Sequence, residues 1–233
     1  NNFGSDDTSI NLIIQEKPET PYGLKVIDKS GRMIKLFWQA PYNGNSNLIR
    51  YVIEYKSFKG TLMNDIDYVM VPGDETMATI ISLKPVTTYH FKVVAQNSIG
   101  ESEPSDPLII ETAEDAPSGP PVDIRVAADC LTLQVSWKPP LTEHWNGDIS
   151  GYYVGYRKIV PLGSAPLPYL FETVEFIKEQ DTKYQLQISN LETFTEYAVV
   201  VQAFNKIGQG PLSDEVLEHT AEDPLAKYIP IVD

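Results

Sequence analysis

The sequence has a single cysteine and few basic residues relative to acidic ones. Each of these shortages argues against a class of function. Cys130 is the only cysteine in 233 residues, so neither an internal disulfide nor a zinc site built from cysteines is possible. The formal net charge is -14, which argues against binding to a nucleic-acid backbone, because such binding needs clustered lysine and arginine. The same charge disfavours an electrostatic membrane anchor, which needs a polybasic segment.

Other functional signals are missing too. There is no apolar run of the ~18 residues that a membrane-spanning helix needs, no signal peptide and no Asn-x-Ser/Thr sequon. The histidines His90, His144 and His219 lie far apart, and none is spaced from Cys130 as a nucleophile pair would be. Phosphate-binding glycine loops, nucleophile elbows and calcium-loop aspartate series do not occur. We therefore expect a protein that is not an enzyme, with no cofactor, no metal and no small-molecule substrate.

The chain does contain an internal repeat. The stretch IGESEPSDPLIIETAED begins at Ile99, and IGQGPLSDEVLEHTAED begins at Ile207, 108 residues later. Trp38 and Trp137 correspond at an offset of 99, so insertions lie between the matching blocks. The hydrophobic fraction of 42% is enough for real cores. Two homologous domains of about 100 residues each are therefore predicted.

Both copies are predicted to consist of strands. Apolar residues alternate along RMIKLFW and TLQVSW, each ending in tryptophan, and along YHFKVVAQN and YAVVVQAFN, each beginning with tyrosine. Successive side chains of a strand point to opposite faces, so this period of two marks half-buried strands. Proline and glycine separate the runs, which is typical of a β-sandwich. The predicted structural core is Trp38, Tyr51, Tyr55, Leu83, Tyr89, Trp137, Tyr152, Tyr156, Leu191 and Tyr197.

An aromatic residue followed by Asn-Gly precedes the third strand of each copy, in WNGDISGYYVGYRK from Trp145 and in YNG from Tyr42. Asn-Gly readily adopts positive φ, so a turn is predicted there. One interpretation makes Trp145 an exposed anchor for a protein contact. The other makes the motif a structural module written twice, and the aromatic residue at the same place in both copies favours it. Trp145 is a candidate residue for a surface contact with another protein.

The two tryptophans, the GY-x-V-x-Y type strand, the L-x-P-x-T-x-Y run from Leu83 to Tyr89 and the N-x-x-G turn resemble fibronectin type III domains. The second copy departs from the pattern at Thr193, where the first has Pro85. The resemblance implies an all-β chain of two tandem seven-stranded sandwiches, at residues 18–115 and 116–222, joined by a short Pro-rich linker. The linker, AEDAPSGPP at residues 113–121, is predicted to be extended and semi-rigid because proline restricts φ.

Closer resemblance is found to the Dscam (Down syndrome cell adhesion molecule) family in its arthropod form. It is carried by WNGDISGYYVGYRK, FETVEFI and VVVQAFNKIGQGPLSDE in the second copy, and by PYGLKVIDKSGR and TAEDAPSGPP in the first copy and linker. Residues 1–17 resemble the last strand of an immunoglobulin domain, with Ile10, Leu12 and Ile14 alternating. Residues 223–233 match neither repeat and are taken as a C-terminal linker.

The Dscam resemblance implies the extracellular stalk of a single-pass, homophilic cell-adhesion receptor of neurons and possibly of immune cells. Its expected partners are other copies of the same receptor and the adjacent immunoglobulin and type III domains. Two alternatives stay open, namely an intracellular muscle-type array of such domains and a receptor ectodomain that binds a heterologous protein ligand. A cytokine-type receptor is disfavoured, because no WS-x-WS motif occurs.

Overall fold

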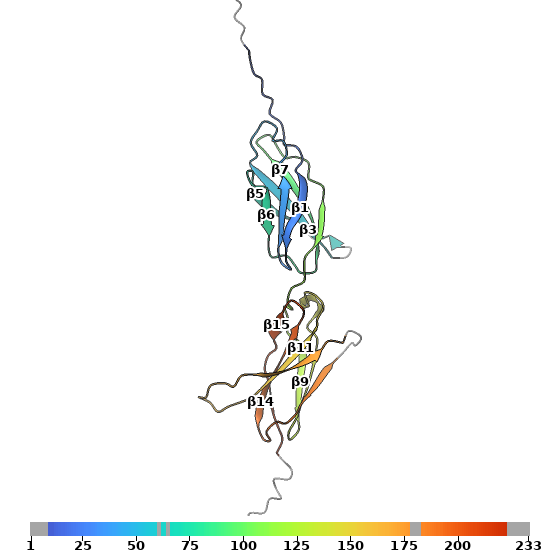
Figure 1. The fold of residues 1–233 in the computed structure, drawn as a ribbon, viewed down its shortest axis with the longest axis vertical. Coiled ribbons are helices and arrows are strands. Elements are labelled where there is room, and N and C mark those ends of the chain that lie inside the picture. The colour runs from blue at the N-terminus through green and yellow to red at the C-terminus, as the bar shows by residue number, and fades with distance from the viewer. Residues whose placement is uncertain (1–8, 60–61, 64–65, 178–182, 223–233) are drawn as a thin grey trace, which may run out of the picture. The chain divides into compact units, whose positions relative to one another are not determined.

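The computed structural model describes residues 9–59, 62–63, 66–177 and 183–222. The chain divides into two compact units between Ala113 and Glu114. Each unit is a sandwich of two antiparallel sheets (Figure 1). Within the described ranges, no helix has the length and apolar character needed to cross a membrane.

The first unit packs a three-stranded sheet against a five-stranded one. The smaller sheet has the order β1-β2-β6, with β1 at Tyr22–Lys29, β2 at Ile34–Gln39 and β6 at Met77–Ile80. The larger sheet has the order β4-β3-β7-β8, and β5 also pairs with β3. Its strands are β3 at Arg50–Lys59, β4 at Leu62–Met63, β5 at Asp67–Pro72, β7 at Thr88–Gln96 and β8 at Leu108–Glu111.

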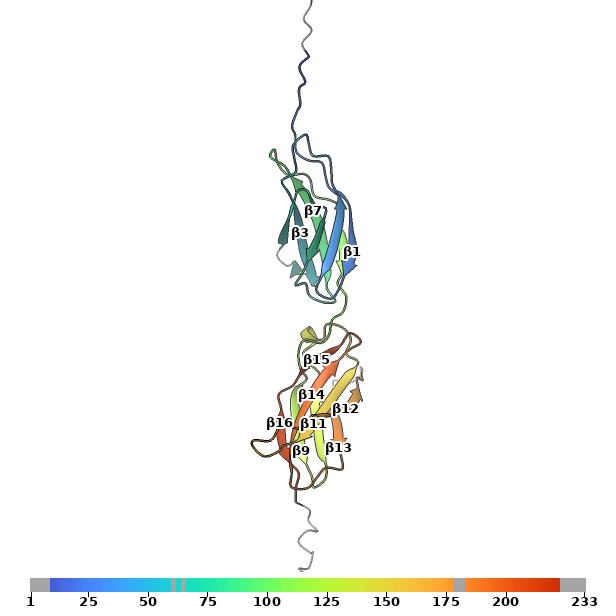
Figure 2. The ribbon, with the colours of Figure 1, turned by 60° about the vertical axis from the view of Figure 1, so that its left-hand side comes forward.

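The second unit repeats this arrangement. Its smaller sheet has the order β13-β10-β9, with β9 at Val122–Ala128, β10 at Leu133–Lys138 and β13 at Tyr184–Ile188. The larger sheet runs β12-β11-β14-β15, and β16 also pairs with β14 (Figure 2). Its strands are β11 at Gly151–Lys158, β12 at Leu170–Glu175, β14 at Glu196–Phe204, β15 at Gln209–Leu212 and β16 at Val216–His219. The predicted all-β tandem fold is confirmed.

The last strand of the second unit is divided by a serine. The Ser213 hydroxyl oxygen accepts a hydrogen bond from the Val201 amide over 3.0 Å. The Ser213 amide donates to the Val201 carbonyl over 2.9 Å. Ser105 binds Val93 in the same way in the first unit. A side-chain oxygen thus replaces a backbone carbonyl in the ladder, and the strand is interrupted there without leaving a buried amide unpaired.

The stretch GYYVGYRK forms β11. One face of this strand packs into the core, and the other lies under aromatic rings on the outside of the sheet. Tyr152 and Val154 are fully buried in the core. On the outer face, Gly155 lies under the Phe171 ring, since a Cβ at Gly155 would come within 2.5 Å of it. Gly151 lies under Phe204 in the same way, at 2.8 Å. The glycines therefore let aromatic rings from neighbouring strands lie flat across the sheet.

Candidate functional site: the ends of each repeat

The structure places the predicted core residues in two separate clusters, one per unit. Trp38, Tyr51, Trp137 and Tyr152 are fully buried, and each tryptophan meets its tyrosine edge to face, with ring centroids 5.2 and 5.5 Å apart. Burial raises the pKa of the Tyr152 phenol far above its ordinary value. The other predicted core residues are also buried or half-buried: Tyr55, Leu83, Tyr89, Tyr156, Leu191 and Tyr197.

Tyr89 and Tyr197, predicted as core residues, each form a tyrosine corner. The Tyr89 hydroxyl accepts a hydrogen bond from the Lys84 amide over 2.9 Å, and the Tyr197 hydroxyl accepts one from the Glu192 amide over 3.0 Å. Each ring is buried while its hydroxyl returns to the backbone five residues earlier. A phenol satisfied in this way costs little to bury.

Trp145, the possible surface contact, is half-buried. Its indole N–H donates to the Pro140 carbonyl over 2.8 Å, and its ring meets Phe176 edge to face at 5.4 Å. The preceding residues Thr142–His144 form a single turn of 3-10 helix. Asn146 has φ 53°, as predicted for the Asn-Gly turn. Only the exposed part of the Trp145 ring is accessible to a partner.

The structure offers little for catalysis or metal binding. Among the described residues, no group of three or more histidine, cysteine, aspartate or glutamate side chains could hold a metal ion. Cys130 is half-buried, and its thiol donates to the Glu222 carbonyl over 3.3 Å. His90 faces outward from β7 and stacks on Phe58 at 4.2 Å.

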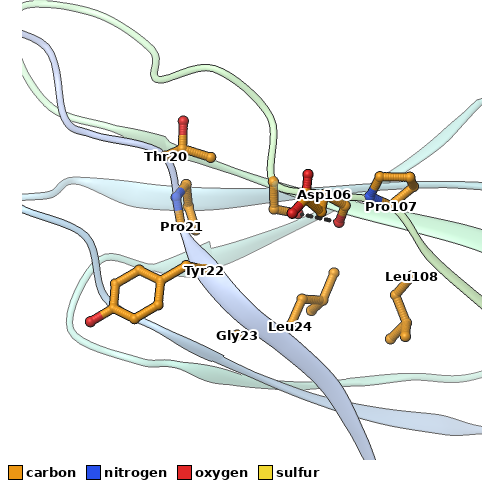
Figure 3. Close-up of a pocket in the computed structure, with 9 residues that line it drawn as sticks. Thr20, Pro21, Tyr22, Gly23, Leu24, Asp106, Pro107 and Leu108 are labelled. Carbon is orange, nitrogen blue, oxygen red and sulfur yellow. Dashed lines mark hydrogen bonds between the residues drawn. The ribbon is translucent and has the colours of Figure 1, made fainter.

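A cavity of about 360 Å³ lies between the start of β1 and the segment before β8 (Figure 3). Leu24 and Leu108 form an apolar floor, and Asp106 supplies its carboxylate. The nearby Ser105 hydroxyl already donates to the Asp106 carbonyl over 3.1 Å. A lone carboxylate without a base or a second ligand beside it supports no reaction chemistry. The remaining lining residues are Thr20, Pro21, Tyr22, Gly23 and Pro107.

The most distinctive polar site of the first unit holds the chain as it enters. The Asn97 side-chain amide donates to the Glu16 carbonyl over 2.7 Å and to the Asn43 carbonyl over 2.9 Å. Its oxygen accepts from the amides of Ile99 and Gly100 at 2.9 and 3.1 Å. Asn97 is only 2% exposed, so one buried side chain closes the turn after β7 and ties the entering segment to it through Glu16.

Asn205 performs the same task in the second unit. Its side-chain amide donates to the Asp115 carbonyl over 2.7 Å, and its oxygen accepts from the amides of Ile207 and Gly208. The Asp115 amide donates to the Asn146 carbonyl, and the Asn146 side chain donates to the Ala116 carbonyl over 2.8 Å. The N-x-x-G and Asn-Gly motifs, far apart in sequence, therefore converge on one incoming segment.

The residue before this anchor is also held by the second unit. Lys206 pairs with the Glu114 carboxylate over 2.9 Å. The Glu114 side chain lies over Gly147, where a Cβ would come within 2.9 Å of it. Residues 114–116 are thus fixed on the second unit by both backbone and side-chain contacts.

The chain is held in an equally regular way where it leaves each unit. The Thr112 amide donates to the Thr87 carbonyl, and the Ala113 amide donates to the Ser30 carbonyl over 3.2 Å. The Thr112 hydroxyl accepts from the Thr87 amide and donates to the Lys84 carbonyl. In the second unit, Thr220 and Ala221 make the equivalent bonds to Thr195, Glu192 and Asp129.

A strained turn completes the site at which the chain leaves each unit. Val86 and Phe194 have φ angles of 45° and 48°, in the left-handed region that β-branched and aromatic residues avoid. Their amides donate to the Ala113 and Ala221 carbonyls, both over 3.2 Å. Their side chains are exposed, so packing of those side chains does not compensate the strain. The sequence gives no sign of this turn, because valine and phenylalanine are residue types that normally avoid the left-handed region.

Comparisons with known proteins agree with this architecture. The family model described as "Fibronectin type III domain" matches residues 18–111 and 115–218. The cell adhesion molecule Dscam1 of Drosophila melanogaster is 51% identical over 223 residues, which are 95% of this chain and 11% of that protein. Human DSCAML1 is 36% identical over 230 residues and human DSCAM 35% over 224, each covering 96% of this chain and 11% of the relative.

The chain thus spans 11% of the length of these curated relatives. Among solved structures, the chicken CNTN1 FN1-FN3 domains align with a TM-score of 0.56 and 25% identity, over 88% of this chain and 67% of that one. The predicted resemblance to the Dscam family is confirmed. The chain belongs to the fibronectin type III family, as two tandem repeats similar to those of the Dscam cell adhesion molecules.

Proposed function

We propose that this chain is an extracellular stalk segment of a homophilic adhesion receptor of the Dscam type, acting as a spacer and as a site of lateral contact between copies. The similarity to proteins named as cell adhesion molecules supports the receptor class. The anchoring of the chain at both ends of each repeat supports the spacer role. A catalytic role has no support in the site just described.

The spacer role is supported by the hydrogen bonds and ion pair that hold residues 112–116 to one repeat or the other. Thr112 and Ala113 are bonded to the first repeat, and Glu114, Asp115 and Ala116 are bonded to the second. The peptide bond between Ala113 and Glu114 is therefore the only connection that neither repeat holds. Since reach and stiffness of a linker depend on its free length, we infer that relative motion of the two repeats is restricted.

The segment before the first repeat fits the same proposal. Ile10, Leu12 and Ile14 are exposed and alternate as the side chains of a β-strand do. Bonding to the first repeat starts at Ile14, whose carbonyl accepts from the Asn45 side chain over 2.9 Å. We infer that residues 1–17 include the last strand of a preceding immunoglobulin-like domain, attached by the same kind of anchored junction.

Distance measurement between the repeats tests the spacer role. Spin labels would be placed on Thr79→Cys in β6 and Gln187→Cys in β13, both exposed, in a Cys130→Ser background. We expect a narrow distance distribution by pulsed electron paramagnetic resonance. The variant Asn205→Ala should broaden it, while Asn47→Ala, at an exposed asparagine, should leave it unchanged. A distribution that is already broad in the parent protein would contradict the spacer role.

Localisation is tested on the full-length gene product. An antibody against residues 18–222 should label the intact cells that express it, without permeabilisation. Labelling only after permeabilisation would favour the intracellular array instead.

A further inference from the structure

The two repeats differ sharply in charge. Residues 1–113 carry 10 lysines and arginines against 14 aspartates and glutamates, whereas residues 114–233 carry 8 against 18. Two copies of such a chain repel each other over most of their surface. Any close contact between copies therefore needs one region of each where this repulsion is absent or reversed.

The first repeat has such a region on the outer face of β5, β3 and β7. Arg50, Lys56 and Lys92 point outward from β3 and β7, opposite to the buried Tyr51, Ile53 and Phe91. Glu54 is the one acidic residue at the outward positions of these two strands. None of the three cations forms an ion pair with a described carboxylate. This surface is called the basic face.

Apolar side chains complete the basic face. Tyr68 and Met70, on the neighbouring β5, are 57% and 65% exposed. Arg50 lies against Met70, with Nη1 to Sδ at 3.6 Å, and the Lys56 ammonium lies over the Phe58 ring at 5.5 Å. Arginine, tyrosine and methionine are the residues enriched at the centres of protein interfaces.

The second repeat carries the opposite charge on the equivalent face, made by β12, β11 and β14 (Figure 2). Its centre is aromatic: Tyr153 stacks on Phe204 at 4.4 Å, and Phe171 is 49% exposed over Gly155. Glu175 is the last residue of β12 and Glu196 the first of β14, and both are at positions whose side chains point outward. We call this surface the acid-rimmed face.

One cation lies on the acid-rimmed face, and it is already neutralised. Arg157 donates to the Glu215 carboxylate over 2.6 Å and lies 4.8 Å from the Tyr169 ring centroid. Glu175 and Glu196 are the other charged residues at the outward positions of these strands, and Glu196 lies 3.8 Å from the His219 imidazole, which carries a charge only when protonated. An apolar centre lies between the two carboxylates. An acidic rim around an aromatic centre suits a basic partner surface that also carries apolar side chains.

We propose that the basic face of one copy binds the acid-rimmed face of a second copy. The charges of the two faces are opposite, both faces carry exposed aromatic side chains, and both belong to the same chain, so the partner is present wherever the receptor is. The contact is heterologous, since it joins different surfaces of the two copies. It deepens the proposed lateral role, but it rests on a separate surface from the anchored junction.

Charge reversal in the intact two-repeat protein tests the contact. Sedimentation equilibrium of the parent protein should show a mass that rises with concentration from 26.1 kDa to beyond twice that value, because each copy carries both faces and can bind a partner with each. The variant Lys56→Glu/Lys92→Glu and the variant Glu175→Lys/Glu196→Lys should each stay at 26.1 kDa. An equimolar mixture of the two variants should associate again, because each supplies the face that the other has lost.

The matched control is Lys25→Glu/Lys35→Glu, which makes the same charge change on β1 and β2 of the other sheet and should weaken association much less. Thermal unfolding of every variant checks that the fold is kept. A parent protein that stays monomeric at its highest soluble concentration would overturn the contact. So would a mixture that fails to associate, or a Lys56→Glu/Lys92→Glu variant that still does. Each of these outcomes leaves the distance test of the junction untouched.

Discussion

The Asn205 side-chain amide and the Asp115 carbonyl, 90 positions apart, are joined by a 2.7 Å hydrogen bond, which fixes the incoming chain to the turn after β14. Asn97 makes the corresponding bond to Glu16 at the same distance in the first repeat. Both asparagines are almost fully buried. The fold therefore uses one side chain both to close a turn and to hold the preceding segment.

Replacing this asparagine should loosen the junction and weaken the repeat. Asn205→Ala leaves the amides of Ile207 and Gly208 and the Asp115 carbonyl without their partner. We expect the second repeat to lose about 2 kcal/mol of unfolding free energy, measured by urea denaturation. Gln209→Ala, at an exposed residue of the same repeat, should change it by less than about 0.5 kcal/mol. A loss as small as in that control would contradict the role of Asn205.

Relief of backbone strain should stabilise the turn at which the chain leaves the second repeat. Phe194 has φ 48° and an exposed ring, so its conformation is costly and its side chain contributes little packing. Phe194→Asn should raise the unfolding free energy by about 0.5–1 kcal/mol, because asparagine tolerates the left-handed region. Phe194→Ala keeps the penalty for a Cβ and serves as the control. An equal gain in both variants would show that loss of the exposed ring, not strain relief, is responsible.

The core and the architecture could be predicted from the sequence, because strand alternation and internal repetition both survive in a single chain. Trp38, Trp137 and the tyrosine corners at Tyr89 and Tyr197 are local patterns of this kind. The junction could not be predicted, since the residue that Asn205 holds, Asp115, lies 90 residues away and is bound through its backbone carbonyl, which leaves no trace in the sequence. The strained φ of Phe194 is equally hidden, because the residue type argues against it.

Removing the buried indole should unfold one repeat without the other. Trp137 is fully buried against Tyr152 and Tyr184, so Trp137→Ala should cost the second repeat roughly 3–5 kcal/mol. Trp145→Ala removes a half-buried ring and one hydrogen bond and should cost less. Urea unfolding should therefore show an early transition for the second repeat and an unchanged one for the first. A loss below about 1 kcal/mol would remove Trp137 from the core.

A methyl group at Gly155 should disturb the acid-rimmed face from below. The added Cβ would come within 2.5 Å of the Phe171 ring and 3.0 Å of Val200, so the ring must move. We expect Gly155→Ala to cost about 1–3 kcal/mol in thermal or chemical unfolding. Gly208→Ala is the control, because its Cβ would only make an ordinary 3.4 Å contact with Ala116. Equal effects of the two substitutions would argue against close packing at Gly155.

The ion pair beside this face predicts a dependence of stability on pH. Hydrogen bonds from Tyr169 and Arg157 hold the pKa of the Glu215 carboxyl below its ordinary value of 4.5. Burial, together with the same carboxylate, raises the pKa of Tyr169 to about 12, so the phenol stays protonated at neutral pH. A carboxyl with a lowered pKa stabilises the fold above its unfolded pKa, and this contribution disappears as the pH falls through the folded pKa.

Glu215→Gln should therefore be less stable than the parent at pH 7 by no more than about 1 kcal/mol, since the pair is partly exposed. The difference should shrink as the pH falls below 4.5 and vanish once the parent carboxyl is protonated. Unfolding midpoints of both proteins from pH 7 to pH 2 measure this. A difference that stays constant across that range would mean that the shape of the side chain, and not its charge, stabilises this corner of the sheet.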